Sequence, residues 1–429
     1  MKRPIFLNLL VIFILAGLVA ACGETAPGPT ATAPAKAGSS LLGTPVGTGT
    51  GSGSATGKVA PVVGADGQIT VMAPPATGEN IAGQIFWVKE NNIWHGGAGA
   101  TGVPPVSIKD LGGKQLTKAP NLAIAQSPAI SPDGTKMAYA FSPEPEGSQG
   151  NIIIGQDIYL YDLKTGENKL LIKRDEAQGF LDQPAWSKDA RFIYFNSRIP
   201  QRDKDKNITG ENISISRMEL ATGTREKLVD DAREPAPLAD GKQVAFISVK
   251  ASTGTYETNL QVLNLETKEV KTLLDPKLGF IAAYLPRSSP DGQLLVFAAA
   301  GGPDINPYAS QPTTTPTPGA VKGGNTGLAR AGGFSLGLTG LLPFGQKPNA
   351  LNAPPAHGVP FDLWLIKPDG TGLKRLTVLF EDQPMAAWSA DGKKIAFLAG
   401  QGFYTIDSDG KNLVKKSDKG GHAGFDWHD

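Results

Sequence analysis

Cysteine is almost missing from this chain, which has one among its 429 residues. A single cysteine excludes an internal disulfide, a zinc site built from several thiolates and an iron–sulfur cluster. A surplus of positive charge is missing too, because 41 Lys and Arg face 40 Asp and Glu. Binding a phosphate backbone requires clustered basic residues, so the composition argues against a nucleic-acid partner. Helical periodicity of useful length is also missing after the first residues of the chain.

One long apolar run is present, from Ile5 to Ala21, and it follows two basic residues. This layout is typical of a secretory signal, and about 17 residues interrupted by Asn8 are few for a membrane span. The only cysteine, Cys22, follows Leu-Val-Ala-Ala, and this segment resembles the bacterial lipobox. The resemblance implies a lipoprotein signal peptide over residues 1–21. The alternative is that a cysteine stands there by chance.

A lipid on Cys22 determines where the chain is expected to reside. Two or three acyl chains hold a protein on a membrane essentially permanently. The sequence therefore predicts an exported protein, anchored on the outer face of the cytoplasmic membrane or facing the periplasm. Residues 22–80 are predicted to form a disordered tether, because 31 of the 38 residues from Gly23 to Ala60 are Gly, Ala, Ser, Thr or Pro.

A repeat occupies the rest of the chain, residues 81–429. Five segments share a proline, a short apolar stretch, an aspartate and a second alternating strand, and the aligned aspartates are Asp133, Asp189, Asp240, Asp291 and Asp391. Four of the five precede a glycine, which accepts the positive φ of a tight hairpin. Each unit continues with a third alternating strand, a polar turn and a short fourth strand. Four strands in about 50 residues are typical of a β-propeller blade.

The most regular unit reads Trp-Ser-Ala-Asp-Gly-Lys-Lys-Ile-Ala-Phe over residues 388–397. It resembles the repeat of TolB-like propellers, which also occurs in the propellers of prolyl-oligopeptidase-type peptidases. The resemblance covers about residues 84–429 and implies a propeller fold, with envelope proteins or peptides held at the channel mouth. Because the repeat fills residues 84–429, we expect no α/β-hydrolase domain of the kind that those peptidases carry.

The two ends of the repeat region complete each other. Residues 84–88, 92–95 and 114–117 match the second, third and fourth strands of a unit, whereas residues 424–429 match a first strand. Trp427 stands there where Trp186 and Trp388 stand in other units, and we expect these side chains to pack between blades rather than to hold a ligand. The prediction is an all-β, six-bladed propeller of four-stranded antiparallel blades, closed by the C-terminal strand in the N-terminal blade, which removes open sheet edges.

The spacing between Asp291 and Asp391 is twice the usual value. Residues 300–360 are rich in Gly, Pro and Thr and contain no Asp-Gly pair, so we interpret them as a low-complexity insertion between the second and third strands of one blade. The alternative is a degenerate seventh blade.

The two faces of this propeller are expected to differ. The Asp-Gly hairpins and other short turns share one face, and the long loops and the insertion share the other. The inner strands begin at the long-loop face, where a tripeptide Asp-Gln-Pro occurs twice. The candidate channel-mouth binding residues are Asp182, Gln183, Glu234, Glu381, Asp382 and Gln383. The alternative for the acids is that they cap strand entries in solvent.

The sequence also contains matches to catalytic and ligand-binding motifs, but none has the local structure that its motif requires. Ser335 lies in a Gly-x-Ser-x-Gly pattern, but the insertion offers no strand-turn-helix to expose it. Gly97–Gly102 matches a dinucleotide pattern, yet two prolines follow in place of a helix. Asp203–Asn207 alternates oxygen ligands with lysines and lacks the glycine of a calcium loop.

The four histidines, His95, His357, His422 and His428, show no metal-ligand spacing, although some TolB-like propellers are polysaccharide lyases with a histidine-rich metal site. The sequence therefore predicts no metal, no cofactor and no catalysis. It favours a monomeric, lipid-anchored envelope module that binds or scaffolds a protein or peptide. The alternative is an envelope polysaccharide lyase or hydrolase that uses the loop-rich face.

Overall fold

The computed structural model describes residues 61–63, 69–71, 76–77, 81–97, 111–120, 123–144, 155–252, 255–305, 360–379 and 381–428. The predicted signal peptide, Cys22 and most of the predicted tether lie outside these residues, as do Ser335 and His357. The chain divides into residues 1–56 and residues 57–429, and all the described residues belong to the second unit. Among them, no helix has the length and apolarity that crossing a membrane requires.

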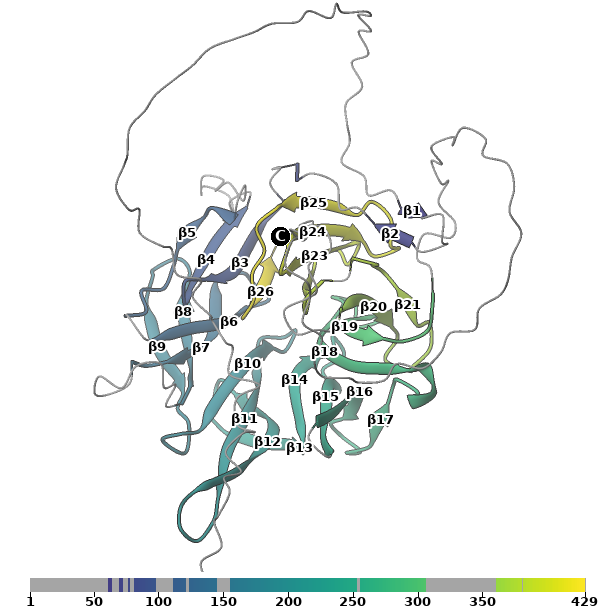
Figure 1. Ribbon diagram of the computed structural model, residues 1–429. Helices are drawn as coiled ribbons and strands as arrows, with labels where there is room; N and C mark the ends of the chain where they lie inside the picture. The colour runs from purple at the N-terminus through teal and green to yellow at the C-terminus, as the bar shows by residue number, and fades with distance from the viewer. Residues whose placement is uncertain are drawn as a thin grey trace, which may run out of the picture. The chain divides into compact units, whose positions relative to one another are not determined.

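Six four-stranded antiparallel sheets form a ring around a central axis in the described part of the chain (Figure 1). We number these blades 1 to 6 along the chain and give their strands from the inside outward. Blade 1 contains β26 (Phe425–His428), β3 (Gln84–Lys89), β4 (Asn92–Gly97) and β5 (Lys114–Gln115). Blade 2 contains β6 (Ile124–Ile130), β7 (Lys136–Ser142), β8 (Asp157–Asp162) and β9 (Asn168–Ile172). Blade 3 contains β10 (Phe180–Trp186), β11 (Phe192–Arg202), β12 (Ile208–Glu219) and β13 (Arg225–Asp230).

The second half of the ring repeats this order. Blade 4 contains β14 (Ala232–Pro237), β15 (Gln243–Ser252), β16 (Thr255–Asn264) and β17 (Val270–Thr272). Blade 5 contains β18 (Phe280–Ser288), β19 (Leu295–Gly301), β20 (Asp362–Ile366) and β21 (Lys374–Arg375). Blade 6 contains β22 (Met385–Trp388), β23 (Lys394–Ala399), β24 (Gly402–Asp407) and β25 (Val414–Ser417). A 3-10 turn, Pro276–Leu278, precedes β18, and a separate hairpin of β1 (Pro61–Val63) and β2 (Ile69–Val71) lies within the predicted tether region.

The ring closes through its C-terminal strand. β26 pairs antiparallel with β3, with Phe425 opposite Trp87 and Trp427 opposite Ile85. Phe425 and Trp427 are both buried, and transfer estimates give about 1.5–3 kcal/mol for each side chain. The six-bladed prediction and its closure are therefore confirmed.

The hairpins between the first and second strands owe their shape to a repeated serine and aspartate. The Ser131 hydroxyl donates to Asp133 Oδ1 at 2.6 Å, and the same carboxylate accepts from the Thr135 amide at 3.1 Å. Gly134 follows with φ of 68°, which the turn requires. The same serine-to-aspartate hydrogen bond recurs at Asp189, Asp291 and Asp391.

Blade 5 contains the doubled spacing. β19 pairs directly with β20, with Leu295 opposite Ile366, so the residues between these strands connect the second and third strands of one blade. Residues 306–359 of this connection lie outside the described residues. The described chain contains six such blades and no seventh.

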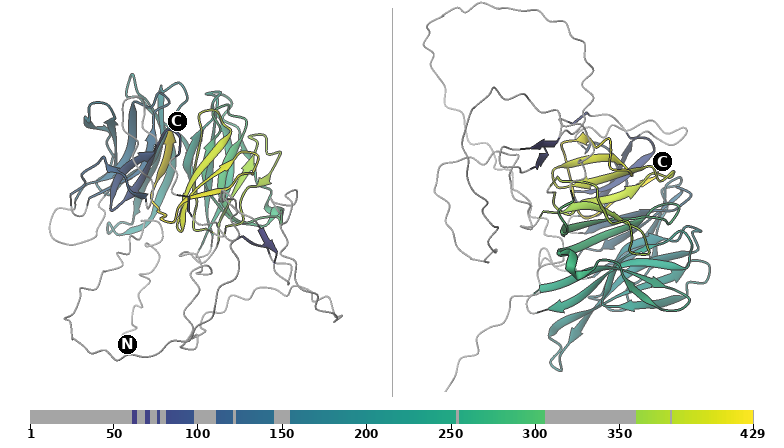
Figure 2. Two further views of the ribbon diagram at one scale, coloured as in Figure 1. Left: turned by 90° about the horizontal axis from the view of Figure 1, so that it is seen from above. Right: turned by 90° about the vertical axis from the view of Figure 1, so that its right-hand side faces the viewer.

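The core lies between blades rather than in one centre. Val296, Leu363 and Phe397, for example, join blades 5 and 6 in one buried cluster. The indole of Trp186 donates to Ala129 O of blade 2 at 2.9 Å, and that of Trp388 donates to Arg287 O of blade 5 at 3.1 Å. These two tryptophans therefore link neighbouring blades, as expected from the repeat. Figure 2 shows the strands of each blade running between the two faces of the ring.

Candidate functional site

A residue with positive φ followed by a proline recurs near the start of the inner strands, and we call this pair a proline step. Five residues with positive φ each precede a proline, and they are Ser127 (53°), Gln183 (51°), Glu234 (59°), Leu285 (53°) and Gln383 (39°). In β6, β10, β14 and β18 the pairing register shifts at this step, which is a β-bulge. Proline suits such a strand because the inner edge has no pairing partner for its N–H. We call the layer formed by these steps the channel mouth.

At three of these steps the backbone amide donates a hydrogen bond to the blade before it. The Ser127 amide donates to Ala423 O at 2.9 Å, and the Glu234 amide donates to Asn196 Oδ1 at 2.7 Å. The Leu285 amide donates to Glu234 Oε2. Because the left-handed conformation recurs in five blades, it belongs to the architecture of the repeat, and it directs these amides toward acceptors in the preceding blade.

Asp182 lies in the bulged part of β10 and is only 8% exposed. Its Oδ1 accepts from Asn196 Nδ2 at 2.7 Å, and its Oδ2 accepts from Arg198 Nη2 at 3.0 Å. Asn196 in turn accepts from the Glu234 amide. Asp182 is thus one member of a hydrogen-bonded series that runs from blade 3 into blade 4.

Glu234 is 7% exposed and lies between two positive groups and a backbone amide. One carboxylate oxygen is 3.6 Å from Arg233 Nε, and the other accepts from the Leu285 amide. Burial raises the pKa of Glu234, and the charges of Arg233 and Arg287 oppose that rise. A buried carboxylate with these partners joins blades 4 and 5.

Glu381 precedes β22 and is 3% exposed. It accepts from the Tyr404 hydroxyl at 2.7 Å and from the Gln401 amide at 3.1 Å, which braces the tight turn between β23 and β24. Burial raises the pKa of Glu381, and burial together with this carboxylate raises the pKa of Tyr404. The Phe361 amide donates to Glu381 O at 2.8 Å and ties blade 5 to blade 6.

The remaining predicted residues also lie at the mouth. Asp382 is 5% exposed, whereas Gln183 and Gln383 are half-buried. Asp382 lies beside the turn at Gly400, where a Cβ would be 3.6 Å from Asp382 Cβ and 3.3 Å from His422 Cε1. All four acids are buried, so the alternative that they are solvated caps does not describe them.

Two charged residues that were not among the predicted ones share one position of the inner strands. Strand pairing aligns one inner-strand position in all six blades, occupied by Ala129, Ala185, Ala236, Arg287, Ala387 and Asp426. Asp426 Oδ2 accepts from the Ile130 amide of blade 2 at 2.7 Å. Desolvation raises the pKa of Asp426, and the charge of Arg287 opposes this rise. The repeat alignment carried this signal, because four blades have alanine where Arg287 and Asp426 stand.

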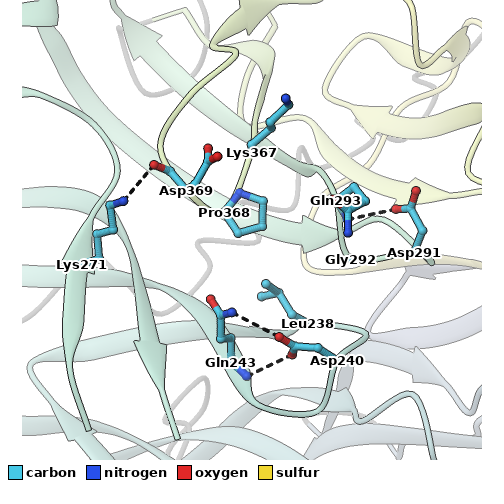
Figure 3. Close-up of a pocket in the computed structure, with 10 residues that line it drawn as sticks. All are labelled: Leu238, Asp240, Gln243, Lys271, Asp291, Gly292, Gln293, Lys367, Pro368 and Asp369. Atoms are coloured by element: carbon cyan, nitrogen blue, oxygen red, sulfur yellow. Dashed lines mark hydrogen bonds between the residues drawn. The ribbon is translucent and has the colours of Figure 1, made fainter. Parts of the chain in front are cut away.

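The short-loop face has its own cavity of about 410 Å³ between blades 4 and 5 (Figure 3). Its aspartates are held by their own turns: Asp240 accepts from the Gln243 amide at 3.1 Å, and Asp291 accepts from the Gln293 amide at 3.0 Å. Lys271 Nζ donates to Asp369 O at 2.9 Å. The aspartate contacts stabilise hairpin turns, and the lysine contact joins blades 4 and 5.

Metal-binding geometry is not found in the described residues. No group of three or more His, Cys, Asp and Glu is placed to hold an ion there. At the tip of the β11–β12 hairpin, Asp203 accepts from the amides of Asp205 and Asn207 at 2.9 Å each. The Asp203 carboxylate therefore shapes its own turn.

No protein-family model matches the chain. An uncharacterised protein of Agrobacterium fabrum is 29% identical over 169 residues, which are 38% of this chain and 50% of that protein. The Tol-Pal system protein TolB of Francisella tularensis is 27% identical over 144 residues, 32% of this chain and 29% of that one. The solved TolB of Acinetobacter baumannii has a TM-score of 0.48 at 16% identity, covering 82% of this chain and 68% of its own. The chain spans half or less of the length of these curated relatives.

Proposed function

We propose that this TolB-like six-bladed β-propeller is a non-catalytic binding or scaffolding module of the cell envelope. A lipid on Cys22 holds it at the membrane, and a protein or peptide partner binds at the channel mouth. The anchor rests on the signal-like residues 1–21 and the single cysteine that follows them. The envelope setting is supported by sequence similarity to a protein of the Tol-Pal system.

The observation that carries the binding role is the convergence of polar groups at the mouth. Consecutive inner strands bring Asp182 and Glu234 together with half-buried Gln183, and blade 6 brings Gln383. The Asp182 carboxylate is held by Asn196 and Arg198 of its own blade, and the Glu234 carboxylate is held by the Leu285 amide of the next blade, so both carboxylates are fixed in position. A preorganised polar opening favours a partner whose backbone and side-chain groups match it, because little ordering is needed on binding.

The test is capture of a partner from intact cells by chemical cross-linking, followed by affinity purification of the full chain. We expect a discrete partner with the unaltered protein and its loss with the double variant Gln183→Trp/Gln383→Trp, which places two bulky neutral side chains at the mouth. Gln293→Trp, on an exposed hairpin of the short-loop face, is the control for a surface tryptophan and keeps the partner. Capture that is insensitive to the mouth variant but lost in the control would contradict the proposal.

A further inference from the structure

The carboxylates at the mouth accept hydrogen bonds from within the fold. Asp182 accepts from Asn196 and Arg198, and Glu234 accepts from the Leu285 amide. Asp426 accepts from the amides of Ile130 and Trp427. Groups bound in this way contribute little to a cationic ligand, because each contact with the ligand would break one within the protein.

Arg233 differs from these carboxylates because it has a buried donor without a hydrogen-bond partner. It is 7% exposed, and its guanidinium carbon lies 4.5 Å from the centroid of the Tyr284 ring. Its Nε is buried and has no hydrogen-bond partner, and its closest carboxylate oxygen, on Glu234, is 3.6 Å away. A guanidinium has five N–H donors, and stacking on a ring leaves the edge that carries them open. Arg233 forms an ion pair with Glu234 but keeps unused hydrogen-bond donors, so it suits a second anion beside that carboxylate.

Arg287 supplies a second guanidinium. It stands where blades 2, 3, 4 and 6 carry alanine, so the fold does not require a long side chain at this position. Within the described residues its side chain makes one hydrogen bond, to Pro286 O at 3.1 Å, and no ion pair. It lies on the innermost strand of blade 5, and its charge opposes the rise in the pKa of both Glu234 in blade 4 and Asp426 in blade 1.

We propose that Arg233 and Arg287 form an anion subsite of the mouth that takes a carboxylate of an acidic peptide segment. This inference rests on the proposed function and specifies the chemistry of the partner. Arginine forks match carboxylates in geometry and form charge-assisted hydrogen bonds about twice as strong as neutral ones. The half-buried amides of Gln183 in blade 3 and Gln383 at the start of blade 6, the blades on either side of blades 4 and 5, offer donors and acceptors for a peptide backbone.

The test is fluorescence anisotropy with the full lipidated chain in detergent and a fluorescein-labelled octapeptide, (Glu-Ser)4. We expect this peptide to bind, with weaker affinity at higher salt, and (Gln-Ser)4 not to bind. Arg287→Ala installs the residue of four other blades, so it should fold normally and lose affinity about tenfold. Arg233→Lys keeps the charge but loses the fork and should give a smaller loss. Arg225→Ala, an exposed arginine on the outer strand β13, is the control and should bind as the unaltered protein does.

Several outcomes would contradict the proposed anion subsite. Equal binding of (Glu-Ser)4 and (Gln-Ser)4, or full affinity in both Arg287→Ala and Arg233→Lys, removes the role of the arginines. Tighter binding of oligogalacturonate than of (Glu-Ser)4 contradicts a peptide and indicates an acidic saccharide. Capture of a partner from cells that depends on Gln183 and Gln383 but not on Arg287 would reject this inference while leaving the proposed function in place.

Discussion

Carboxyl groups in this protein have two opposite environments. Hairpin aspartates such as Asp133 are exposed and accept several short local hydrogen bonds, which stabilise their charged form. Glu234 and Glu381 are buried, and burial disfavours their charged form. The same residue type therefore shapes turns on one face and joins blades at the other.

The hairpin aspartates make the free energy of unfolding depend on pH in the acidic range. The Ser131 hydroxyl and the Thr135 amide lower the pKa of Asp133 from 3.8 to about 2. Because the folded-state pKa lies below the unfolded one, this contribution is complete above about pH 5 and is lost as the pH falls from 3.8 toward 2. Asp133→Asn should therefore flatten the fall in stability over this range, measured as the urea midpoint at successive pH values. Identical pH profiles for variant and parent would contradict the assignment.

Substitution of Glu234 tests whether its carboxylate stabilises the contact between blades 4 and 5. Glu234→Ala leaves the Leu285 amide without its acceptor and Arg233 without its carboxylate, and should lower the free energy of unfolding by about 3–5 kcal/mol. Glu234→Gln keeps an acceptor oxygen and should cost less. Urea denaturation of both variants measures the difference. Small and equal losses would mean that Glu234 contributes no more than a solvated charge.

At the scale of elements, the repeat could be predicted because its hairpins depend on local sequence. Ser-x-Asp-Gly and alternating apolar residues determine a turn and two strands without help from distant residues. The bulge at each proline step was not predicted. It depends on the neighbouring blade, since the Glu234 amide finds its acceptor on Asn196 in blade 3. Arg287 was missed although the repeat alignment carries its signal, because it stands two residues before the hairpin serine, where Ala129 and Ala387 stand in other blades.

The closing strand gives the clearest prediction at this scale. Deleting residues 424–429 removes the inner strand of blade 1 and exposes the edge of β3. We expect aggregation or a fall in melting temperature of many degrees, measured by light scattering and circular dichroism. The double substitution Phe425→Ser/Trp427→Ser keeps the chain length and should reproduce much of this loss. A stable monomer after the deletion would contradict the closure.

For the whole molecule, the proposed lipid on Cys22 would determine where the protein is held. Cys22→Ser removes the thiol that would carry the lipid, so we expect loss of labelling by a palmitate analogue and release from the membrane fraction, or accumulation of the precursor. Ser39→Cys in the Cys22→Ser background controls for cysteine content. A Cys22→Ser protein that is still processed and sediments with membranes would show that another element holds it there.

The most direct test of the central claim is site-specific photo-cross-linking in intact cells. A benzophenone amino acid placed at Gln183 or Gln383 samples the channel mouth, and the same group at Gln293 samples the short-loop face. If the mouth binds a protein partner, the first two positions should give the same discrete adduct, and Arg287→Ala should weaken it. Adducts from Gln293 with none from Gln183 or Gln383 would place binding on the opposite face and contradict the account.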